Sequence, residues 1–265
     1  MLKLNNINKS FNVGTVNEKH VLQGLELHIE PGDFITVIGG NGAGKSTMLN
    51  VISGVYSVDS GSIVLDGEDI TNLPEYKRAK YLGRVFQDPM MGTASNMSIT
   101  ENLAMAYRRV KRRGLSWGVK KGEVEKYKEV LKTLDLGLEN RMETKVGLLS
   151  GGQRQAITLI MATLQKPKLL LLDEHTAALD PKTAKKVLDL TQEIVERDSL
   201  TTLMITHNMK DAIRIGNRLV MMHNGKIIYD VKGEEKKQLK TSDLLEKFST
   251  VSGEELANDR MLLSE

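Results

Sequence analysis

The sequence predicts an α/β fold with parallel strands, an antiparallel β component and an inserted helical subdomain. Three observations support this prediction. The glycine-rich segment 39–47 stands between an apolar run and a helix-like run. The runs 169–172 and 202–205 are largely apolar and short enough for buried parallel strands. From about residue 88 to 165 the hydrophobic pattern has a helical period, whereas strand-like runs dominate on both sides.

The first eighty or so residues are expected to form many short strands and one helix, and strands resume at 169. We expect helices at 48–52, 181–197 and 208–215, and strands at 2–7, 21–29, 34–38, within 60–67, 82–86, 169–174 and 202–206. Phe11 follows the first strand on an expected turn, and 218–230 is typical of a hairpin turning at Asn224-Gly225. We interpret residues 1–230 as one domain with the helical subdomain inserted at about 88–165, followed by a short charged C-terminal extension at 231–265.

The composition is typical of a globular chain and limits the kinds of partner that we expect. Of 265 residues, 40% are hydrophobic, which is enough for a sizeable core. The net charge of +3 is far from the concentrated positive charge of a nucleic-acid binder, so we expect no nucleic-acid partner. The chain contains no cysteine, which excludes disulfides and suits a reducing compartment such as the cytoplasm. No apolar run approaches about eighteen residues and the N-terminus lacks a signal pattern, so we expect neither a membrane span nor a leader.

Segment 39–47 has the composition and spacing of a phosphate-binding P-loop. Its residues are Gly39, Gly40, Asn41, Gly42, Ala43, Gly44, Lys45, Ser46 and Thr47. The glycines let the backbone turn tightly and present N–H groups to phosphate oxygens, and the following helix adds the positive end of its dipole. Lys45 can reach the β- and γ-phosphates of a nucleoside triphosphate, and the Ser46 hydroxyl can bind Mg²⁺. A glycine turn that matches this pattern by chance is the alternative.

Two adjacent carboxylates, Asp173 and Glu174, end the apolar run 169–172. A buried strand can carry Asp173 to its C-terminal end, where the carboxylate binds Mg²⁺ opposite Ser46. Successive strand side chains point to opposite sides, so Glu174 can instead orient and polarise the attacking water. The alternative is a solvated strand end, but a strand this apolar has little reason to end in paired acids.

A second glycine turn, Ser150-Gly151-Gly152-Gln153, opens the helical run 154–164. Like the P-loop, it can offer backbone N–H groups and a helix dipole to an anion. An ordinary turn with Ser150 as the N-cap explains the local pattern equally well.

In this order and spacing, several segments resemble the ATPase subunits of ATP-binding cassette (ABC) transporters: 39–47, Gln87, 149–153, Asp173-Glu174, Asp180 and His207. The resemblance runs from about residue 2 to 230. It implies a P-loop NTPase fold with a RecA-like core, hydrolysis of ATP with Mg²⁺, and a head-to-tail dimer of two cassettes. In such a dimer the Ser150 loop of one copy would cap the γ-phosphate held by the P-loop of the other.

The resemblance also implies roles for residues that local reasoning leaves open. Phe11 is similar to the aromatic residue that stacks on adenine, although the family more often has Tyr. Gln87 resembles the residue that links the γ-phosphate and Mg²⁺ to the helical subdomain, and Asp180 resembles one at the dimer interface. His207 resembles a residue that contacts the γ-phosphate; it also ends a predicted buried strand, with a core histidine as the alternative. His175 stands where the family usually has Pro, and it either changes the proton balance of the site or is structural or subfamily-specific.

We expect the chain to hydrolyse ATP and thereby drive solute import through a separate membrane permease, at the inner face of the cell membrane. Expected partners are the permease, a second copy of the chain and, indirectly, an extracytoplasmic solute-binding protein. The alternative is a soluble cassette that acts as an assembly scaffold. A DNA-repair cassette would need a long coiled coil between Lys45 and Ser150, and this interval is too short for one. Translation cassettes generally carry two P-loops, whereas this sequence has one.

A finer resemblance concerns the transported solute, which this subunit is not expected to touch. The segments 173–181 and 91–94 resemble a little-characterised bacterial importer group, some members of which are associated with tryptophan or tyrosine uptake. The basic segment 108–121, which contains the single tryptophan Trp117, leaves two interpretations open. It is either a solvated helix and loop or a contact with anionic lipid or the permease.

Overall fold

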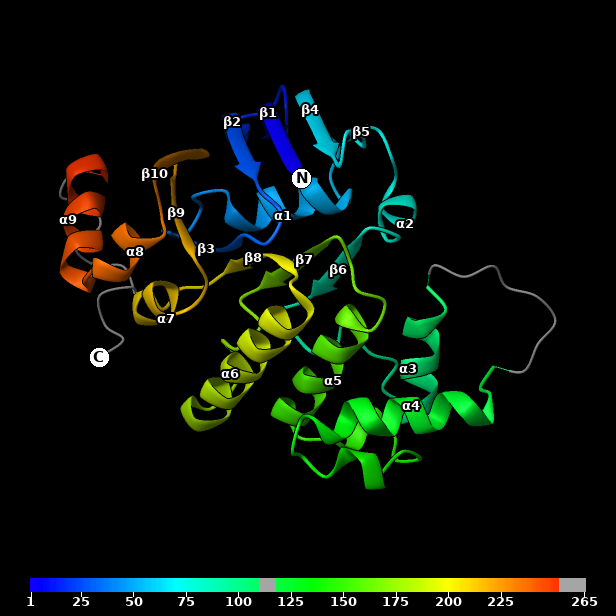
Figure 1. The fold of residues 1–265 in the computed structure, drawn as a ribbon. Helices are drawn as coiled ribbons and strands as arrows, with labels where there is room; N and C mark the ends of the chain where they lie inside the picture. The colour runs from blue at the N-terminus through cyan, green and yellow to red at the C-terminus, as the bar shows by residue number, and fades with distance from the viewer. Residues whose placement is uncertain (110–117, 253–265) are drawn as a thin grey trace. The chain divides into compact units, whose positions relative to one another are not determined.

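The computed structural model describes residues 1–109 and 118–252, which form two compact units (Figure 1). The first unit consists of residues 1–78 and the described residues from 201 onward, and the second consists of the described residues of 79–200. The centre of the basic segment, with Trp117, and the end of the predicted C-terminal extension lie outside the described residues.

The first unit contains two groups of strands and several short helices. Its elements are β1 (Leu2–Phe11), β2 (Lys19–Ile29), β3 (Phe34–Gly39), α1 (Lys45–Ser53), β4 (Ser60–Leu65), β5 (Glu68–Asp69), α2 (Glu75–Arg78), β8 (Thr201–Ile205), α7 (Met209–Arg214), β9 (Arg218–His223), β10 (Lys226–Lys232), α8 (Glu234–Gln238) and α9 (Thr241–Ser252).

An antiparallel sheet forms in the order β2-β1-β4-β5, and it is the antiparallel component that was expected. Leu2 and Leu4 of β1 are buried, because alternate side chains of this strand face the interior, and Ile7 is buried after a register shift between Leu4 and Ile7. Leu2 pairs with Ile29 of β2 on one side and with Leu65 of β4 on the other. The N-terminal strand is therefore central in its sheet.

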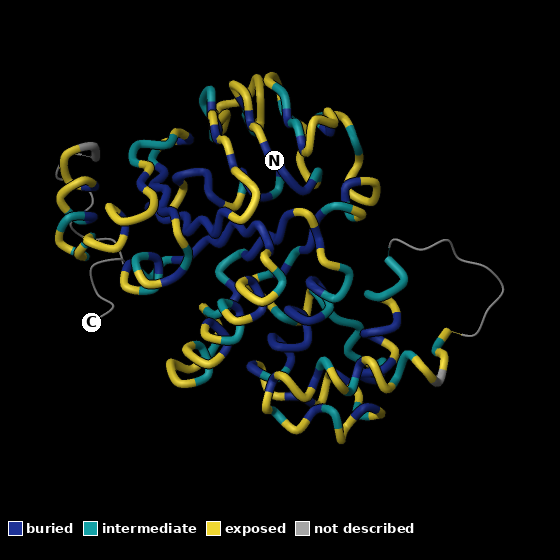
Figure 2. The backbone as a smooth tube through the Cα atoms, in the orientation of Figure 1, coloured by how far each residue is buried: buried dark blue, intermediate teal, exposed yellow. Residues whose placement is uncertain are grey.

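The strands β10, β9, β3 and β8 form the second sheet of this unit, in that order. β3 pairs in parallel with both β9 and β8, and every residue of β3 and β8 is buried (Figure 2). β9 and β10 form the predicted hairpin, which turns at Asn224-Gly225. Both turn residues have positive φ, 45° and 74°, as a type I′ turn requires.

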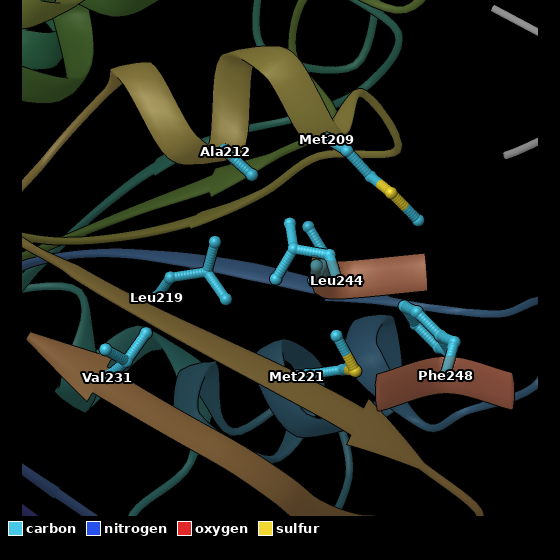
Figure 3. Packing of buried hydrophobic residues seen from close by; sticks show 8 residues of the cluster. Met209, Ala212, Leu219, Met221, Val231, Leu244 and Phe248 are labelled. Atoms are coloured by element: carbon cyan, nitrogen blue, oxygen red, sulfur yellow. The ribbon is translucent and has the colours of Figure 1, made fainter. Parts of the chain in front are cut away.

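The C-terminal helix α9 packs on this sheet through a cluster of apolar side chains. The cluster consists of Ile38, Met209, Ala212, Leu219, Met221, Val231, Leu244 and Phe248. In Figure 3, Leu244 and Phe248 of α9 point toward side chains of α7 and β9. This part of the charged C-terminal segment therefore contributes apolar side chains to the core of the first unit.

The second unit is mostly helical, with two parallel strands. Its elements are β6 (Leu82–Val85), α3 (Ile99–Tyr107), α4 (Lys121–Lys132), the 3₁₀ turns η1 (Leu138–Asn140) and η2 (Val146–Leu148), α5 (Gly151–Thr163), β7 (Leu169–Asp173) and α6 (Pro181–Asp198). Nearly all of α5 is buried, and β6 pairs in parallel with β7. The mixed α/β class with an antiparallel component and a helical part is thus confirmed.

Two expectations about local structure are wrong. Phe11 is the last residue of β1 and not part of a turn, because it still pairs with Lys19 of β2. The strand expected over 169–174 ends at Asp173, since Glu174 has a φ of 46°, outside the range that a strand allows. Within the described residues, no helix combines the length and apolar character that crossing a membrane would require.

Candidate functional site

The P-loop connects β3 to α1 in the first unit. β3 ends at Gly39 and α1 begins at Lys45, so the loop lies between a buried parallel strand and a helix. Ser46, in the first turn of α1, is exposed. This strand, loop and helix order is the context that a phosphate-binding loop requires.

Lys45 lies against the backbone of its own loop and is only 5% exposed. Its Nζ donates hydrogen bonds to Gly39 O at 2.6 Å and to Gly40 O at 3.1 Å. The buried ammonium is thereby compensated by carbonyl oxygens, as a buried charge must be. A phosphate oxygen offers a stronger, charge-assisted acceptor, so Lys45 can exchange these partners for a nucleotide.

The first turn of α1 has no side-chain cap. Its N-cap residue is Gly44, with a φ of 98° in the left-handed region that favours glycine. A glycine N-cap brings no side-chain oxygen to the first N–H groups of the helix. The positive end of the helix dipole can therefore interact with an external anion.

His207 follows β8 at the same edge of the sheet as the P-loop. β8 pairs with β3 in parallel, with Ile205 opposite Val37, and Thr206 N donates to Val37 O at 3.1 Å. His207 is half-buried, and α7 begins directly after it with Asn208 as the N-cap. The structure thus brings His207 and the P-loop to the C-terminal ends of neighbouring strands, where open α/β sheets bind ligands.

Phe11 lies at the end of β1 with its ring partly exposed. Tyr56 packs edge-on against it, with ring centroids 5.2 Å apart, and Lys9 Nζ is 5.5 Å from the Phe11 centroid. Phe11 therefore belongs to a small aromatic and cationic cluster, a surface suited to stacking a planar base.

In the second unit, Asp173 is the last residue of β7, and Gln87 is the second residue after the end of β6. The two strands are parallel, with Val85 opposite Leu172, so Asp173 and Gln87 follow strand ends at one edge. Arg84 Nη2 lies 3.7 Å from Asp173 Oδ2. A cation therefore accompanies the carboxylate that the sequence predicts as a Mg²⁺ ligand.

Glu174 is the first residue after β7, and its backbone is left-handed with a φ of 46°. Ala177 N donates to Glu174 O at 2.9 Å, which closes a turn immediately after the strand. The prediction that strand alternation points Asp173 and Glu174 to opposite sides is therefore wrong. They differ because the chain leaves the strand between them.

His175 is buried beside the next helix. It is 2% exposed, and its Nε2 lies 3.0 Å from Thr191 Oγ1 of α6. Burial lowers the pKa of His175 to about 4, so the ring is neutral at physiological pH. Of the two interpretations of His175, the structural one agrees with this position.

Gln87 is exposed, and the backbone beside it is tied to the helical part of the same unit. Gln155 Nε2 of α5 donates to Phe86 O at 3.2 Å. Gln155 is fully buried, so α5 fixes the residue next to Gln87 while the Gln87 side chain stays accessible.

Ser150 is the N-cap of α5. Gln153 N donates to Ser150 Oγ at 3.3 Å and Ser150 N to Gln153 Oε1 at 3.3 Å, which completes a capping box. The N-cap reading of this serine is therefore correct in the structure. It does not exclude an anion, because the exposed hydroxyl can still donate its own hydrogen.

The glycines after Ser150 allow α5 to approach the start of α6. A Cβ at Gly152 would overlap the methyl group of Thr183, and one at Gly151 would lie 3.2 Å from Leu179. Asp180 is exposed and caps α6, accepting from Thr183 N at 3.1 Å. The hydrogen bonds from Thr183 lower the pKa of Asp180. The structure thus brings the Ser150 loop and the segment around Asp180 together.

The oxygen donors predicted for Mg²⁺ fit this ion chemically. Ser46, Gln87 and Asp173 carry hydroxyl, amide and carboxylate oxygens, which are the hard ligands that Mg²⁺ prefers. Within residues 1–109 and 118–252, no cluster of three or more His, Cys, Asp or Glu side chains could hold a metal by itself. A few protein oxygens that complete the shell of a nucleotide-bound ion are the usual arrangement for Mg²⁺.

Sequence reasoning missed two residues beside the predicted site. Arg84 stands inside a buried strand between Gly83 and Val85, and a charged residue in such a run is a local signal that could have been used. Thr191 carries no such signal, because its relation to His175 depends on how α6 packs on the turn after β7.

The comparisons with known proteins agree on one family. The profile described as "ABC transporter" matches residues 22–177. A tyrosine transport ATP-binding protein of Clostridioides difficile is 46% identical over 94% of this chain and 98% of its own length. A spermidine/putrescine import ATP-binding protein of Haemophilus influenzae is 36% identical over 87% of this chain, which spans only 57% of that longer relative.

Solved structures give the same result. A dimeric ATP-binding cassette in a post-hydrolysis state, bound to ADP and Pi, superposes with a TM-score of 0.73 and 29% identity, covering 88% of this chain and 98% of that one. We conclude that this chain belongs to the ABC transporter family and is one of its ATP-hydrolysing cassettes.

Proposed function

We propose that the chain energises import of an aromatic amino acid, tyrosine or tryptophan, or of a closely related small solute, through a separate membrane permease. The observation that carries this proposal is the likeness to the tyrosine transport ATP-binding protein, which extends over 94% of this chain at 46% identity. The polyamine import relative reaches 36% identity over 87% of the chain. The permease would hold the cassette at the inner face of the membrane.

The proposed chemistry assigns a role to each residue of the predicted site. The P-loop from Gly39 to Thr47 binds the phosphates, with Lys45 neutralising the β- and γ-phosphates. Glu174 polarises the attacking water, and His207 contacts the γ-phosphate. Phe11 stacks on the adenine ring. Phe11 ends β1, the P-loop leads from β3 into α1, Glu174 follows β7 and His207 follows β8.

Mg²⁺, when bound with ATP, would neutralise phosphate charge during hydrolysis. We propose Ser46, Asp173 and Gln87 as its protein ligands. Arg84, 3.7 Å from Asp173, compensates the carboxylate when the ion is absent.

We further propose that two copies act together, head to tail. The Ser150-Gly151-Gly152-Gln153 segment of one copy would face the γ-phosphate bound by the P-loop of the other, and Asp180 would lie at the interface. The exposed Ser150 hydroxyl and the exposed Asp180 carboxylate support this role. An extracytoplasmic binding protein would deliver the solute to the permease.

The solute is tested best on the binding protein encoded beside this gene, because the cassette itself does not touch the solute. We expect isothermal calorimetry to detect binding of tyrosine or tryptophan, and the assembled transporter to hydrolyse ATP faster when that loaded protein is added. Heat with spermidine or putrescine but none with tyrosine, tryptophan or phenylalanine would reject the aromatic solute and leave the cassette ATPase untouched.

The second candidate, a soluble assembly scaffold without a permease, is not favoured, because the relatives compared above are transport and import subunits. Co-purification separates the two. A tagged chain that brings a membrane protein with it from detergent-solubilised membranes supports transport, and one recovered only with soluble partners contradicts it.

A further inference from the structure

A buried hydrogen bond ties the turn after β7 to the middle of α6, and the chemistry described above does not use it. His175 in the turn is 2% exposed, and Thr191 on α6 is fully buried. His175 Nε2 and Thr191 Oγ1 are 3.0 Å apart. A polar pair removed from water persists only when its hydrogen bond is made, so this contact constrains both elements.

The hydrogen-bond network fixes which atom donates. Thr191 Oγ1 donates its single hydrogen to Val187 O, one turn earlier in α6, at 2.7 Å. The same oxygen can then only accept from His175, so the proton of the neutral ring is on Nε2. His175 is therefore a donor with a fixed tautomer, anchored to an oxygen that α6 itself holds in place.

The residue before His175 is Glu174, the proposed water-polarising carboxylate. Its left-handed φ of 46° is uncommon for a residue with a side chain and persists only where the surroundings enforce it. On one side, Glu174 is held by the end of β7 at Asp173. On the other side stands His175, whose side chain is bound to α6.

We propose that His175 is a positioning residue for Glu174: its hydrogen bond to Thr191 holds the turn in the conformation that aims the Glu174 carboxylate at the attacking water. The inference rests on the role proposed above for Glu174. The imidazole acts here as a fixed donor and exchanges no proton with the substrate. Displacement of a catalytic group by about 1 Å can cost up to about a hundredfold in rate, so loss of this anchor is expected to reduce turnover.

The first test replaces the imidazole. We expect His175→Ala to lower kcat of the ATPase reaction by about tenfold or more, with KM for ATP within about twofold of the parent, because nucleotide binding does not depend on the turn. Gln places an N–H donor near the position of Nε2, whereas Asn places its donor nearer to Nδ1. His175→Gln should therefore recover most of the turnover, and His175→Asn should not.

The second test leaves His175 in place and removes its acceptor. Thr191→Val keeps the shape of the side chain and should lower kcat as His175→Ala does, while the double variant should lose no more than either single variant. Thr163→Val is the matched control. Thr163 is also buried and back-bonded, with Oγ1 donating to Leu159 O at 2.9 Å, but it is at the end of α5. It should retain the parent kcat.

Glu174→Gln, measured in the same assay, separates this inference from the proposed function. If Glu174→Gln abolishes turnover while Thr191→Val and His175→Ala keep kcat within about twofold, the positioning role is wrong and the role of Glu174 survives. If Glu174→Gln keeps the parent turnover, the role proposed for Glu174 fails, and the positioning role of His175 fails with it. Should His175→Ala not fold, Thr191→Val decides alone: parent turnover in that variant overturns the proposal.

Discussion

Two neighbouring carboxylates show how the backbone distinguishes residues of the same chemistry. Asp173 is still part of β7 and lies 3.7 Å from Arg84, so its position follows from strand pairing. Glu174 is already in a turn with a left-handed backbone. The different duties proposed for the two acids, binding Mg²⁺ and polarising water, therefore rest on one change of backbone conformation.

At this residue scale we predict that Glu174→Gln retains ATP binding but loses hydrolysis, because an amide cannot polarise water as a carboxylate does. ATP should then accumulate in a stable dimer, which size-exclusion chromatography with ATP and Mg²⁺ would detect. Glu193→Gln, at an exposed position of α6, is the control and should behave like the parent. A Glu174→Gln protein that stays monomeric and hydrolyses ATP at the parent rate would show that Glu174 is assigned wrongly.

Lys45 carries a second prediction. Lys45→Ala removes the buried ammonium that bonds to Gly39 O and Gly40 O, and with it the cation proposed for the β- and γ-phosphates. We expect turnover to fall by about a hundredfold or more, as the loss of a preorganised charge usually causes. The exposed Lys77 of α2 provides the control substitution, Lys77→Ala. Parent activity in Lys45→Ala would contradict the P-loop assignment.

The burial of Lys236 is expected to make the stability of the protein depend on pH. It is 1% exposed, and its Nζ donates to Ile215 O and Gly216 O. Burial lowers its pKa from 10.5 to about 8. Between these values the unfolded chain holds more protons than the folded one, so the free energy of unfolding should rise as pH increases through this window. The gain is at most roughly 3 kcal/mol.

The test measures the free energy of unfolding in urea at pH 7.5 and at higher pH, for the parent and for Lys236→Met. Comparing the two proteins separates the contribution of Lys236 from that of the other titrating groups. The difference in unfolding free energy between parent and variant should shift in favour of the parent as the pH rises. A difference that is constant over the whole range would mean that folding does not lower the pKa of Lys236.

At the scale of elements, α9 is a part of the first unit whose sequence looked like a charged extension. Phe248 is 6% exposed and belongs to the cluster with Met209 of α7 and Met221 of β9 (Figure 3). We predict that Phe248→Ala lowers the free energy of unfolding by about 3 kcal/mol, the usual cost of truncating a buried Phe. Thermal unfolding would measure it, with the exposed Glu246→Ala on the same helix as control. Equal stability of the two variants would show that α9 does not pack on this core.

The elements differ in how far the sequence alone predicts them. The strands β3, β7 and β8 are short, largely apolar runs, which local sequence patterns predict as buried strands. The spacing of the glycines predicts the P-loop in the same way. The left-handed Glu174 and the packing of α9 carry no local signal. Both depend on residues distant in sequence, such as Met209 for α9, and tertiary packing overrides local preference at such positions.

At the scale of the whole molecule, a head-to-tail pair would divide each catalytic site between two copies. The P-loop with Lys45 belongs to the first unit and the Ser150 loop to the second. In a two-fold dimer, a surface of one copy meets a different surface of the other and the reverse contact occurs as well, so each of the two sites takes one surface from each copy. A defect in Lys45 of one copy and a defect in Ser150 of the other therefore fall in the same site, which leaves the second site intact.

The last prediction follows from this arrangement. Lys45→Ala and Ser150→Phe should each be inactive alone, but an equal mixture should recover about one quarter of the parent activity, because half of the dimers are mixed and each has one intact site. Titrating Lys45→Ala into the parent measures how well a single intact site works and calibrates this value. If each copy instead completed its own site with its own Ser150 loop, every copy in the mixture would be damaged. Suppose that the titration into the parent shows that a single intact site works. A mixture of the two variants that is as inactive as either variant alone would then exclude the head-to-tail arrangement.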